Sequence, residues 1–482
     1  MSTTHIALNR FGYGIRKGKV VPDDPKRSLL REMDAFEASP AALAGREDTS
    51  DRAGEILETL RLQRLERRAM RLRTMADDAV QQVSEKQLMA ARERAGPLAD
   101  LPEDLRNAFL DGGRIVRRDI ALRINIAVAS DTPFIERLVH FWSNHFSVSA
   151  RKAGTPHQVG NHEFSAIRPR VLGKFSDLLK AAVLHPAMLI YLDQFQSIGP
   201  NSMVQRRFRR RGLNENLARE IMELHTLGVN GGYSQDDVTG FARALTGWSI
   251  SGLARLDRIA QPQPGGAVFA VVAHEPGTRT ILGKTYRSEG AQQALDVLDD
   301  LATHPSTARF IATKLARHFA GDEPPESLVS RLENDFNRTG GDLASLTRRL
   351  VEAPECWTVG PVKYRQPQEW LISVLRFAGA GALEDRRIAN ALKQLGQLPW
   401  GAPSPAGYDD IEGSWAGPDA LFRRVDLAER IARIVPADGL LQRAERAFPD
   451  ALSDHTRLWL SRAESDGQAL GLLLVSPEMM RR

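Results

Sequence analysis

Apolar residues recur every three or four positions along most of this 482-residue chain, interrupted at stretches rich in glycine and proline. This spacing places apolar side chains on one face of an α-helix, whereas a half-buried strand alternates every second residue. The pattern therefore predicts an all-α fold, with residues 1–482 forming a single, large and irregular body of many helices. The predicted helices include residues 103–129, 132–147, 173–184, 214–227, 235–247, 305–320 and 367–378.

Two segments are predicted to stand apart from this body. Residues 55–94 read as a long helical arm, because an apolar seam with heptad-like spacing runs from Leu62 to Val83. The seam is expected either to pack on the body or to form a dimerising coiled coil. Residues 251–290 are rich in proline and glycine and contain short β-branched runs, which predicts an inserted loop with one small β-hairpin within 265–290.

Motif content excludes several classes of protein. Cys356 is the single cysteine, so the chain has no internal disulfide, no cysteine-rich zinc module and no haem attachment motif. No nucleotide-binding P-loop or dinucleotide fingerprint occurs. The cofactor is therefore left unknown, with a divalent metal as one alternative.

Charge and hydropathy bear on partners and location. The formal net charge is +5, and the arginine-rich run at 206–211 is better explained as a solvated loop than as a nucleic-acid contact. No apolar run is long enough to span a bilayer, and the N-terminus lacks the pattern of a signal peptide. The cytoplasm is the expected compartment, and the oligomeric state is left open.

Histidines point to the part of the chain that carries chemistry. Six of the eleven lie in one stretch, namely His140, His145, His157, His162, His185 and His225. In the predicted helix 133–146, His145 shares the apolar face with Phe141, which predicts a buried ring. His140 shares a polar line with Asn144 and is expected to be exposed.

The predicted helix 214–227 offers a polar partner for His145. Its apolar face contains Leu217, Ile221 and Leu224. Glu220 lies beside that face, and His225 lies on the opposite flank. A carboxylate in such a position must be paired, hydrogen-bonded or bound to a metal. We therefore predict that the two helices pack together, so that His145 and Glu220 approach each other or share a ligand.

The candidate site follows from these two helices. The candidate catalytic residues are His145, Glu220 and His225. The candidate ligand-binding residues are Trp142, Asn144, Asn214, Asn216, Arg219, Glu223 and Trp248. Three interpretations stay open: a metal held by several helices, a metal-free acid–base or ligand site, and a structural polar network. Neither the Glu-x-x-His spacing of di-iron bundles nor a His-Glu-x-x-His zinc helix is present.

Longer motifs carry a family resemblance. They lie at residues 7–14, 141–146, 186–193, 214–229, 231–238, 242–248 and 281–284. Together they resemble a large bacterial family catalogued as domain of unknown function eighteen hundred. The chain departs from the family pattern at Ser143, where members often have a second histidine, at His274-Glu275 and within 401–415.

The resemblance implies a mainly helical fold and no particular reaction. Members of the family are often encoded beside an exported protein that looks like a relative of sulfatases and phosphatases, which implies such a protein as a partner. Many relatives are exported, so carriage out of the cell on that partner is the alternative to a cytoplasmic location.

Two functions are consistent with the sequence. The first is a hydrolase or ligand-binding protein with a buried His/Glu/Asn/Arg site that acts on an envelope-related substrate. The second is a non-catalytic accessory protein that binds and stabilises the sulfatase/phosphatase-like partner. The first predicts that the site residues line an accessible cavity, and the second predicts that they are sealed in the core while apolar residues are exposed elsewhere.

Overall fold

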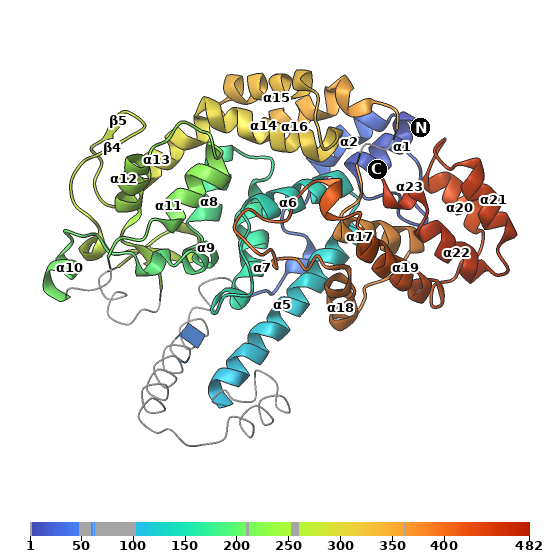
Figure 1. Cartoon of the computed structure of the whole chain (residues 1–482), viewed down its shortest axis with the longest axis horizontal. Coiled ribbons are helices and arrows are strands. Elements are labelled where there is room, and N and C mark those ends of the chain that lie inside the picture. Colours follow the sequence, from blue (N-terminus) through green and yellow to red (C-terminus); the bar gives the residue numbers. More distant parts are fainter. Residues whose placement is uncertain are drawn as a thin grey trace.

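The computed structural model of the chain describes residues 2–47, 59–60, 62, 103–208, 212–251, 260–360 and 363–482. Most of the arm predicted at 55–94 lies outside these residues, as do Arg209–Arg211 of the arginine-rich run. Figure 1 shows the arrangement of the described elements.

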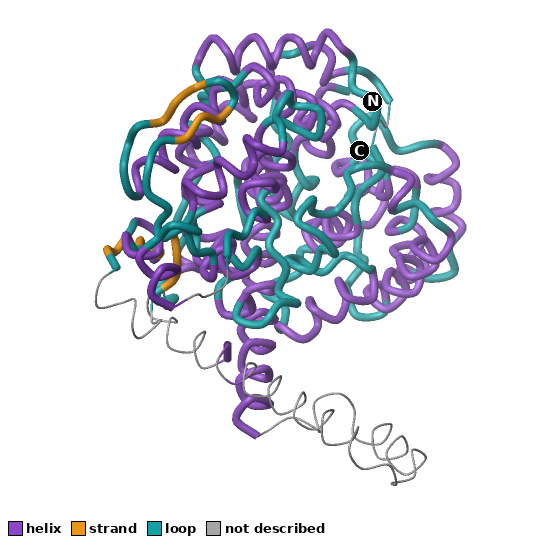
Figure 2. The backbone as a smooth tube through the Cα atoms, turned by 60° about the vertical axis from the view of Figure 1, so that its left-hand side comes forward, coloured by secondary structure: helices purple, strands orange, loops and turns teal. Residues whose placement is uncertain are grey.

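Helices dominate the fold, as predicted (Figures 1 and 2). In the first half they are α1 (Thr3–Ile6), α2 (Pro25–Ala35), α5 (Glu103–Ala129), α6 (Pro133–His145), α7 (Val159–Asn161), α8 (Phe175–Val183), α9 (Pro186–Tyr191), α10 (Met203–Phe208), α11 (Asn216–Glu220) and α12 (Gln235–Leu245). In the second half they are α13 (Ala291–Thr303), α14 (Pro305–Ala320), α15 (Glu326–Thr339), α16 (Leu343–Glu352), α17 (Pro367–Ala378), α18 (Asp385–Leu395), α19 (Pro418–Ala432), α20 (Leu440–Ala447), α21 (Asp454–Arg462), α22 (Asp466–Leu474) and α23 (Pro477–Met480).

Local sequence explains where these helices begin and end. Ser234 accepts a hydrogen bond from the Asp237 amide at the start of α12, and the Asp237 side chain accepts one from the Ser234 amide in return. Pro367 lies in the first turn of α17, where its missing N–H costs nothing. Gly379 ends the same helix in the left-handed conformation, with φ of 70°.

The β-structure is richer than the single predicted hairpin. That hairpin is present as β4 (Arg279–Ile281) and β5 (Lys284–Tyr286). A second antiparallel sheet has the order β1-β3-β2 and consists of β1 (Trp248–Ile250), β2 (Gln261–Pro262) and β3 (Ala267–Phe269). Ser249 pairs with Val268, so the β-branched run near 268 joins the strand that follows α12 instead of the hairpin. Strands of two or three residues are too short to show a periodicity, which is why the sequence did not predict this sheet.

The helices enclose a continuous core. One cluster of buried apolar residues extends from Ile6 to Met480. In Figure 1, α6 lies near the middle, with α8–α13 on the left, α14–α16 across the top and α17–α23 on the right. In the described part of the chain, no helix combines the length and the apolar character that a membrane crossing requires.

Buried arginines connect the two ends of the described chain to its centre. Arg137 in α6 donates to the carbonyl oxygen of Phe11 at 3.0 Å. Arg365, just before α17, donates to the side-chain oxygen of Asn9 at 2.7 Å and to the carbonyl of Met479 at 2.6 Å. The N-terminal segment and α23 therefore meet beside α17.

Candidate functional site

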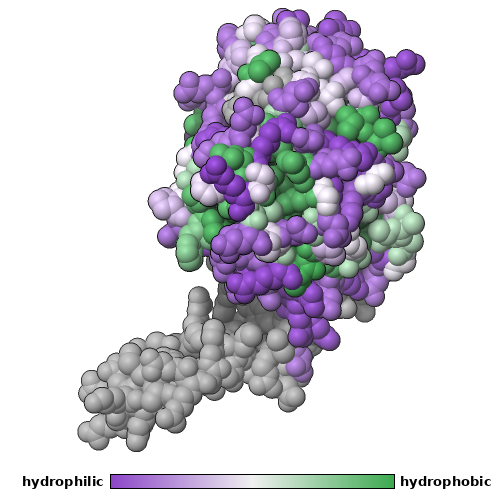
Figure 3. All heavy atoms as spheres, turned by 90° about the vertical axis from the view of Figure 1, so that its right-hand side faces the viewer, coloured by the Kyte–Doolittle hydropathy of each residue, from purple (hydrophilic) through white to green (hydrophobic). Residues whose placement is uncertain are grey.

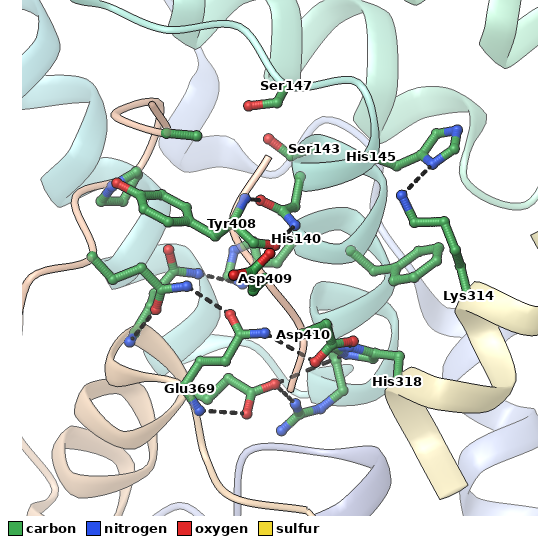
Figure 4. Close-up of a pocket in the computed structure, with 18 of the residues that line it drawn as sticks. His140, Ser143, His145, Ser147, Lys314, His318, Glu369, Tyr408, Asp409 and Asp410 are labelled. Atoms are coloured by element: carbon green, nitrogen blue, oxygen red, sulfur yellow. Dashed lines mark hydrogen bonds and ion pairs between the residues drawn. The ribbon is translucent and has the colours of Figure 1, made fainter. Parts of the chain in front are cut away.

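A polar cavity of about 320 Å³ lies between α6, α14, the start of α17 and the loop at 396–411 (Figure 4). Tyr13, from the segment after α1, and Arg123 of α5 also contribute to its walls, so parts of the chain that are distant in sequence meet here. Among its lining residues are Tyr13, Arg123, Arg137, His140, Ser143, Asn144, His145, Ser147, Lys314, Arg317, His318, Gln366, Gln368, Glu369, Gln397, Trp400, Tyr408, Asp409 and Asp410.

The prediction that His140 is exposed was wrong. Only 8% of its surface is accessible, and its ring lines the cavity. The Tyr13 hydroxyl lies 2.7 Å from its Nδ1, and the Gln368 side-chain amide donates to the same nitrogen at 3.2 Å. The polar line of α6 faces this internal cavity and not the solvent, which the spacing of residues could not distinguish.

These partners determine the protonation of His140. The Gln368 side-chain oxygen accepts a hydrogen bond from Arg123, so its amide nitrogen must face the imidazole. Nδ1 is then an acceptor, and the proton of the neutral ring lies on Nε2. Burial, followed by the charges of Arg123, Arg168 and Arg137, holds the pKa of His140 well below 6.5. The cavity therefore contains a neutral imidazole whose Nε2–H has no hydrogen-bond partner among the described residues.

His318 bridges two carboxylates across the cavity wall (Figure 4). Its Nδ1 lies 2.7 Å from Asp410, and its Nε2 lies 3.9 Å from Glu369. Burial alone would raise the pKa of Asp410, but His318, Lys363 and Arg482 together hold that pKa well below 3.8. An ionised Asp410 can only accept, so the Nδ1 proton stays on His318. Burial outweighs the two carboxylates and lowers the pKa of His318, so the ring is neutral and Nε2 is its unprotonated nitrogen.

Glu369 is a lining residue of the cavity that pairs with two buried arginines. Its carboxylate is paired with the guanidinium groups of Arg137 and Arg482, the latter with both hydrogen bonds at 3.2 Å. Burial would raise the pKa of Glu369, but the two arginines outweigh it and bring the pKa to about 2. Glu369 is therefore a permanent anion that holds two buried cations in place.

His145 is buried, as predicted, with 1% of its surface accessible. Its Nδ1 accepts a hydrogen bond from the Lys314 ammonium at 3.0 Å, and its Nε2 donates to the carbonyl oxygen of His225 at 3.1 Å. Both ring nitrogens are thus occupied by groups other than Glu220. Burial and the Lys314 charge hold the pKa of His145 well below 6.5, so the ring is neutral.

Asn144 holds the loop that closes the cavity. Its side-chain amide donates to the Tyr408 carbonyl at 2.8 Å, and its side-chain oxygen accepts from the Tyr408 N–H at 2.8 Å. Gly407 allows this close approach, because a Cβ there would lie 2.4 Å from the Asn144 carbonyl oxygen. Trp142, predicted as a ligand-binding residue, is buried against the Phe175 and His145 rings and is not among the cavity's lining residues.

The helix predicted at 214–227 is divided. It begins as α11 and continues as a π-helical segment over Ile221–Thr226. Each residue that a π-turn inserts rotates the following residues by about 100°. His225 is consequently fully buried, whereas Leu224, expected on the apolar face, is only half-buried.

The remaining predicted residues do not line the cavity. Glu220 is half-buried, and burial followed by the Glu223 charge raises its pKa. Arg219 pairs with Glu215 at 3.3 Å, and Asn214 donates to the Leu192 carbonyl at 2.9 Å. Two further candidates differ in exposure: Asn216 is exposed and Trp248 is buried in β1. Of the candidates, the structure brings Asn144 and His145 to the cavity, with His225 directly behind His145.

Several residues of the cavity were missed by the sequence analysis. They include Lys314, His318, Glu369 and Asp410. One signal was available in α14, where Lys314 and His318 are four residues apart and so share a face of a mainly apolar helix. The described residues include no group of three or more histidine, cysteine or carboxylate side chains arranged to hold a metal ion.

Comparison with known proteins gives one match. The family model described as Protein of unknown function (DUF1800) matches residues 6–481, which is nearly the whole chain. The chain belongs to the DUF1800 family. The resemblance inferred from its motifs is thereby confirmed. Comparisons with curated proteins and with solved structures found no significant match. The description of the DUF1800 family names no reaction, so the chemistry must be argued from the cavity itself.

In this DUF1800 chain, we expect Asn144→Ala to loosen the loop at 396–411. Loss of the two hydrogen bonds to Tyr408 should lower the free energy of unfolding by about 1–3 kcal/mol, because half-buried main-chain groups lose their partners. Hydrogen exchange should accelerate at 399–411 while α6 stays protected. Asn337→Ala, on the exposed face of α15, is the matched control and should change neither quantity.

Proposed function

We propose that this DUF1800 chain is a hydrolase that binds a polar substrate in the cavity between α6, α14 and α17. The observation that carries the proposal is the Asp410–His318 pair on the cavity wall. Asp410 holds the Nδ1 proton of His318 and leaves Nε2 without a hydrogen-bond partner among the described residues. This is the arrangement that orients a histidine as a general base. Nε2 is enclosed beside Glu369, at 3.9 Å, so water reaches it only when the side chains between this nitrogen and the cavity shift.

His140 supplies a complementary group. Hydrolysis places negative charge on a substrate oxygen, and a fixed N–H donor in a site of low dielectric stabilises that charge. The Nε2–H of neutral His140 is such a donor, and its ring is held by Tyr13 and Gln368. In the proposed reaction, His318 accepts a proton from water as the water oxygen bonds to the electrophilic atom of the substrate, and His140 donates a hydrogen bond to the oxygen that gains charge. The bond to the leaving group then breaks, and the leaving group takes the proton back from His318 as it departs.

The cavity is costly to maintain, which also supports a role in ligand binding. Burying charged groups such as Arg123, Arg137 and Glu369 requires every charge to be paired and hydrogen-bonded. A helical body could pack the same volume with apolar residues at no loss of stability. A polar and hollow interior is better explained by a ligand that occupies it.

The test is a panel of chromogenic nitrophenyl substrates: acetate, phosphate and sulfate esters and a set of glycosides. We expect the wild-type chain to hydrolyse at least one class, and His318→Asn to lower kcat by about a hundredfold or more, because a general base contributes on that order. The asparagine amide can still donate to Asp410, so the loop should stay in place. His455→Asn on α21 is the matched control and should keep full activity.

Equal activity in His318→Asn and wild type would contradict the proposed base. Absence of hydrolysis across the whole panel would contradict the hydrolase and leave the second candidate function, an accessory protein for a sulfatase/phosphatase-like partner. That alternative is favoured by exposed apolar side chains in the C-terminal part of the chain: Phe422 in α19 is 73% exposed, and Ile434 in the turn that follows is 70% exposed. Figure 3 shows hydrophobic residues among hydrophilic ones on this face.

We also propose that the substrate of the hydrolase is envelope-related and that the chain leaves the cell bound to a sulfatase/phosphatase-like partner. Both predict that the chain co-purifies with the envelope fraction when the neighbouring sulfatase/phosphatase-like protein is present, and with the cytosol when it is deleted.

A further inference from the structure

Two cations of α14 face the cavity, and neither is in direct contact with a carboxylate of the described residues. Lys314 and Arg317 both line it, and their positions three residues apart place them on the same face of the helix. Neither forms an ion pair with a described carboxylate: Lys314 donates a hydrogen bond to His145, and Arg317 donates one to the carbonyl oxygen of Asp322 at 3.2 Å. Like charges at this spacing repel each other, so an anion bound between them would stabilise the pair.

The other cations of the cavity behave differently. Arg123 is paired with Glu163 at 2.8 Å, and Arg137 is paired with Glu369. These ion pairs leave little positive charge for a ligand. The charge that a ligand can neutralise is therefore concentrated at Lys314 and Arg317, on the α14 side of the cavity (Figure 4 shows Lys314).

Lys314 is held in position by a chain of two hydrogen bonds that runs through His145 to the His225 carbonyl. The carbonyl oxygen of His225 can only accept, so it fixes the His145 proton on Nε2. Nδ1 of His145 must then be the acceptor that receives a proton of the Lys314 ammonium, at 3.0 Å. One of the three ammonium protons is thus directed at His145, and two remain for a ligand.

We propose that Lys314 and Arg317 form an oxyanion-binding subsite of the cavity, which takes a carboxylate, sulfate or phosphate group of the ligand. His145 is the positioning residue of this subsite. The proposal rests on the proposed function in taking the cavity as the substrate site, and it adds the charge class of that substrate.

The subsite should respond to pH. Burial lowers the pKa of Lys314 to about 8, with Asp410 opposing this shift and Arg317 adding to it. The histidines nearest the ammonium are His145, His225 and His318, and burial holds the pKa of each below the ordinary value of 6.5, so all three are neutral at pH 8. The carboxylates of the same cavity are Asp409, Asp410 and Glu369. Anion affinity should therefore be highest below pH 8 and fall as the pH rises through 8, because Lys314 loses its charge while Arg317 keeps its own.

The experiment is competitive labelling of lysines with acetic anhydride on the full chain, with the extent of reaction at Lys314 read by mass spectrometry. The probes are inorganic sulfate, inorganic phosphate and acetate, each against sodium chloride of equal ionic strength. We expect at least one anion to slow labelling of Lys314 tenfold or more at pH 7, and to do so less at pH 9. Exposed Lys393 in α18 is the internal control and should label equally with and without the anion.

Calorimetric titration with the same anions gives the second readout. Lys314→Met should weaken binding by tenfold or more, whereas Lys393→Met should leave it unchanged. Two variants test the role of His145. His145→Phe removes the nitrogen that accepts the Lys314 hydrogen bond, whereas the side chain of His145→Gln can accept from Lys314 and donate to the His225 carbonyl. His145→Gln should retain anion protection of Lys314, and His145→Phe should lose it.

Each outcome decides the proposal. Protection by sulfate or phosphate alone indicates a tetrahedral oxyanion, and protection by acetate indicates a carboxylate. The subsite is overturned if none of the three anions slows the labelling of Lys314. It is also overturned if Lys314→Met binds the anions as tightly as the wild type does. That failure differs from failure of the proposed hydrolase, because uncharged nitrophenyl substrates would still be hydrolysed and would still depend on His318.

Discussion

Glu369→Gln should lower the free energy of unfolding by about 3–5 kcal/mol, because removal of one partner from a buried ion pair leaves the other charge uncompensated. Two buried guanidinium groups, those of Arg137 and Arg482, would lose their counterion at once. Glutamine has nearly the same volume and keeps one acceptor oxygen, so the loss reports charge and not packing. Urea unfolding at pH 7 measures it.

Glu429→Gln is the matched control for this substitution. Its carboxylate is on the exposed side of α19, 3.7 Å from Arg433, and surface pairs of this kind contribute about 0–1 kcal/mol. A loss below 1 kcal/mol in Glu369→Gln, equal to that of the control, would show that water reaches the Glu369 cluster.

The same carboxylate predicts a pH dependence of stability. The pKa of Glu369 is about 2 in the folded chain, against 4.5 for the ordinary group. The unfolded chain therefore binds a proton more readily, so the stabilisation is fully present above pH 4.5 and is lost as the pH falls towards 2. Acid unfolding of wild type should be steeper between pH 4.5 and 2 than that of Glu369→Gln.

Arg376→Met should have the second large effect, a loss of at least about 3 kcal/mol, because hydrogen bonds to a charged donor contribute about 1.5–3 kcal/mol each. One guanidinium nitrogen of Arg376 donates to the carbonyls of Ala127, Val128 and Ser130 at 2.9–3.0 Å, where α5 ends without further helical partners. Its Nε donates to the carbonyl of Gly14 at 3.0 Å.

Methionine keeps most of the apolar stem of Arg376 and removes all of these donors. Arg387→Met, on the exposed face of α18, is the matched control and should change stability by less than about 0.5 kcal/mol. Thermal unfolding measures both variants. Unchanged stability in Arg376→Met would mean that water replaces the guanidinium at the end of α5.

The comparison of sequence with structure separates local from long-range information. The buried position of His145 was predictable, because a stripe of apolar residues along one helix is a local property. The exposure predicted for His140 was wrong, because a polar line on a helix can face either solvent or a hollow interior. Only the positions of Tyr13 and Gln368 decide between the two, and no local spacing encodes them.

The segment 214–227 shows a second reason why burial could not be predicted from the sequence. The phase of a regular helix predicted that Leu224 is buried and that His225 lies on a flank, and the π-helical segment reverses both assignments. A π-turn changes one hydrogen-bond spacing without a distinctive residue pattern, so the periodicity gives no warning of it. The cluster of Glu369, His318 and Asp410 was missed for a simpler reason: its members come from three segments whose approach depends on the whole fold.

The buried arginines that join the two ends of the described chain affect the order in which the molecule can fold. Asn9 and Arg365 are separated by 356 positions, and Arg10 and Arg482 by 472. Contacts this distant make folding slow, since the loop entropy must be overcome before the contact contributes. During synthesis, the N-terminal segment and α6 emerge hundreds of residues before their partners in α17 and α23, with buried cations such as Arg137 still unpaired. The cavity is thus completed among the last steps of folding, when nearly all of the chain has been made.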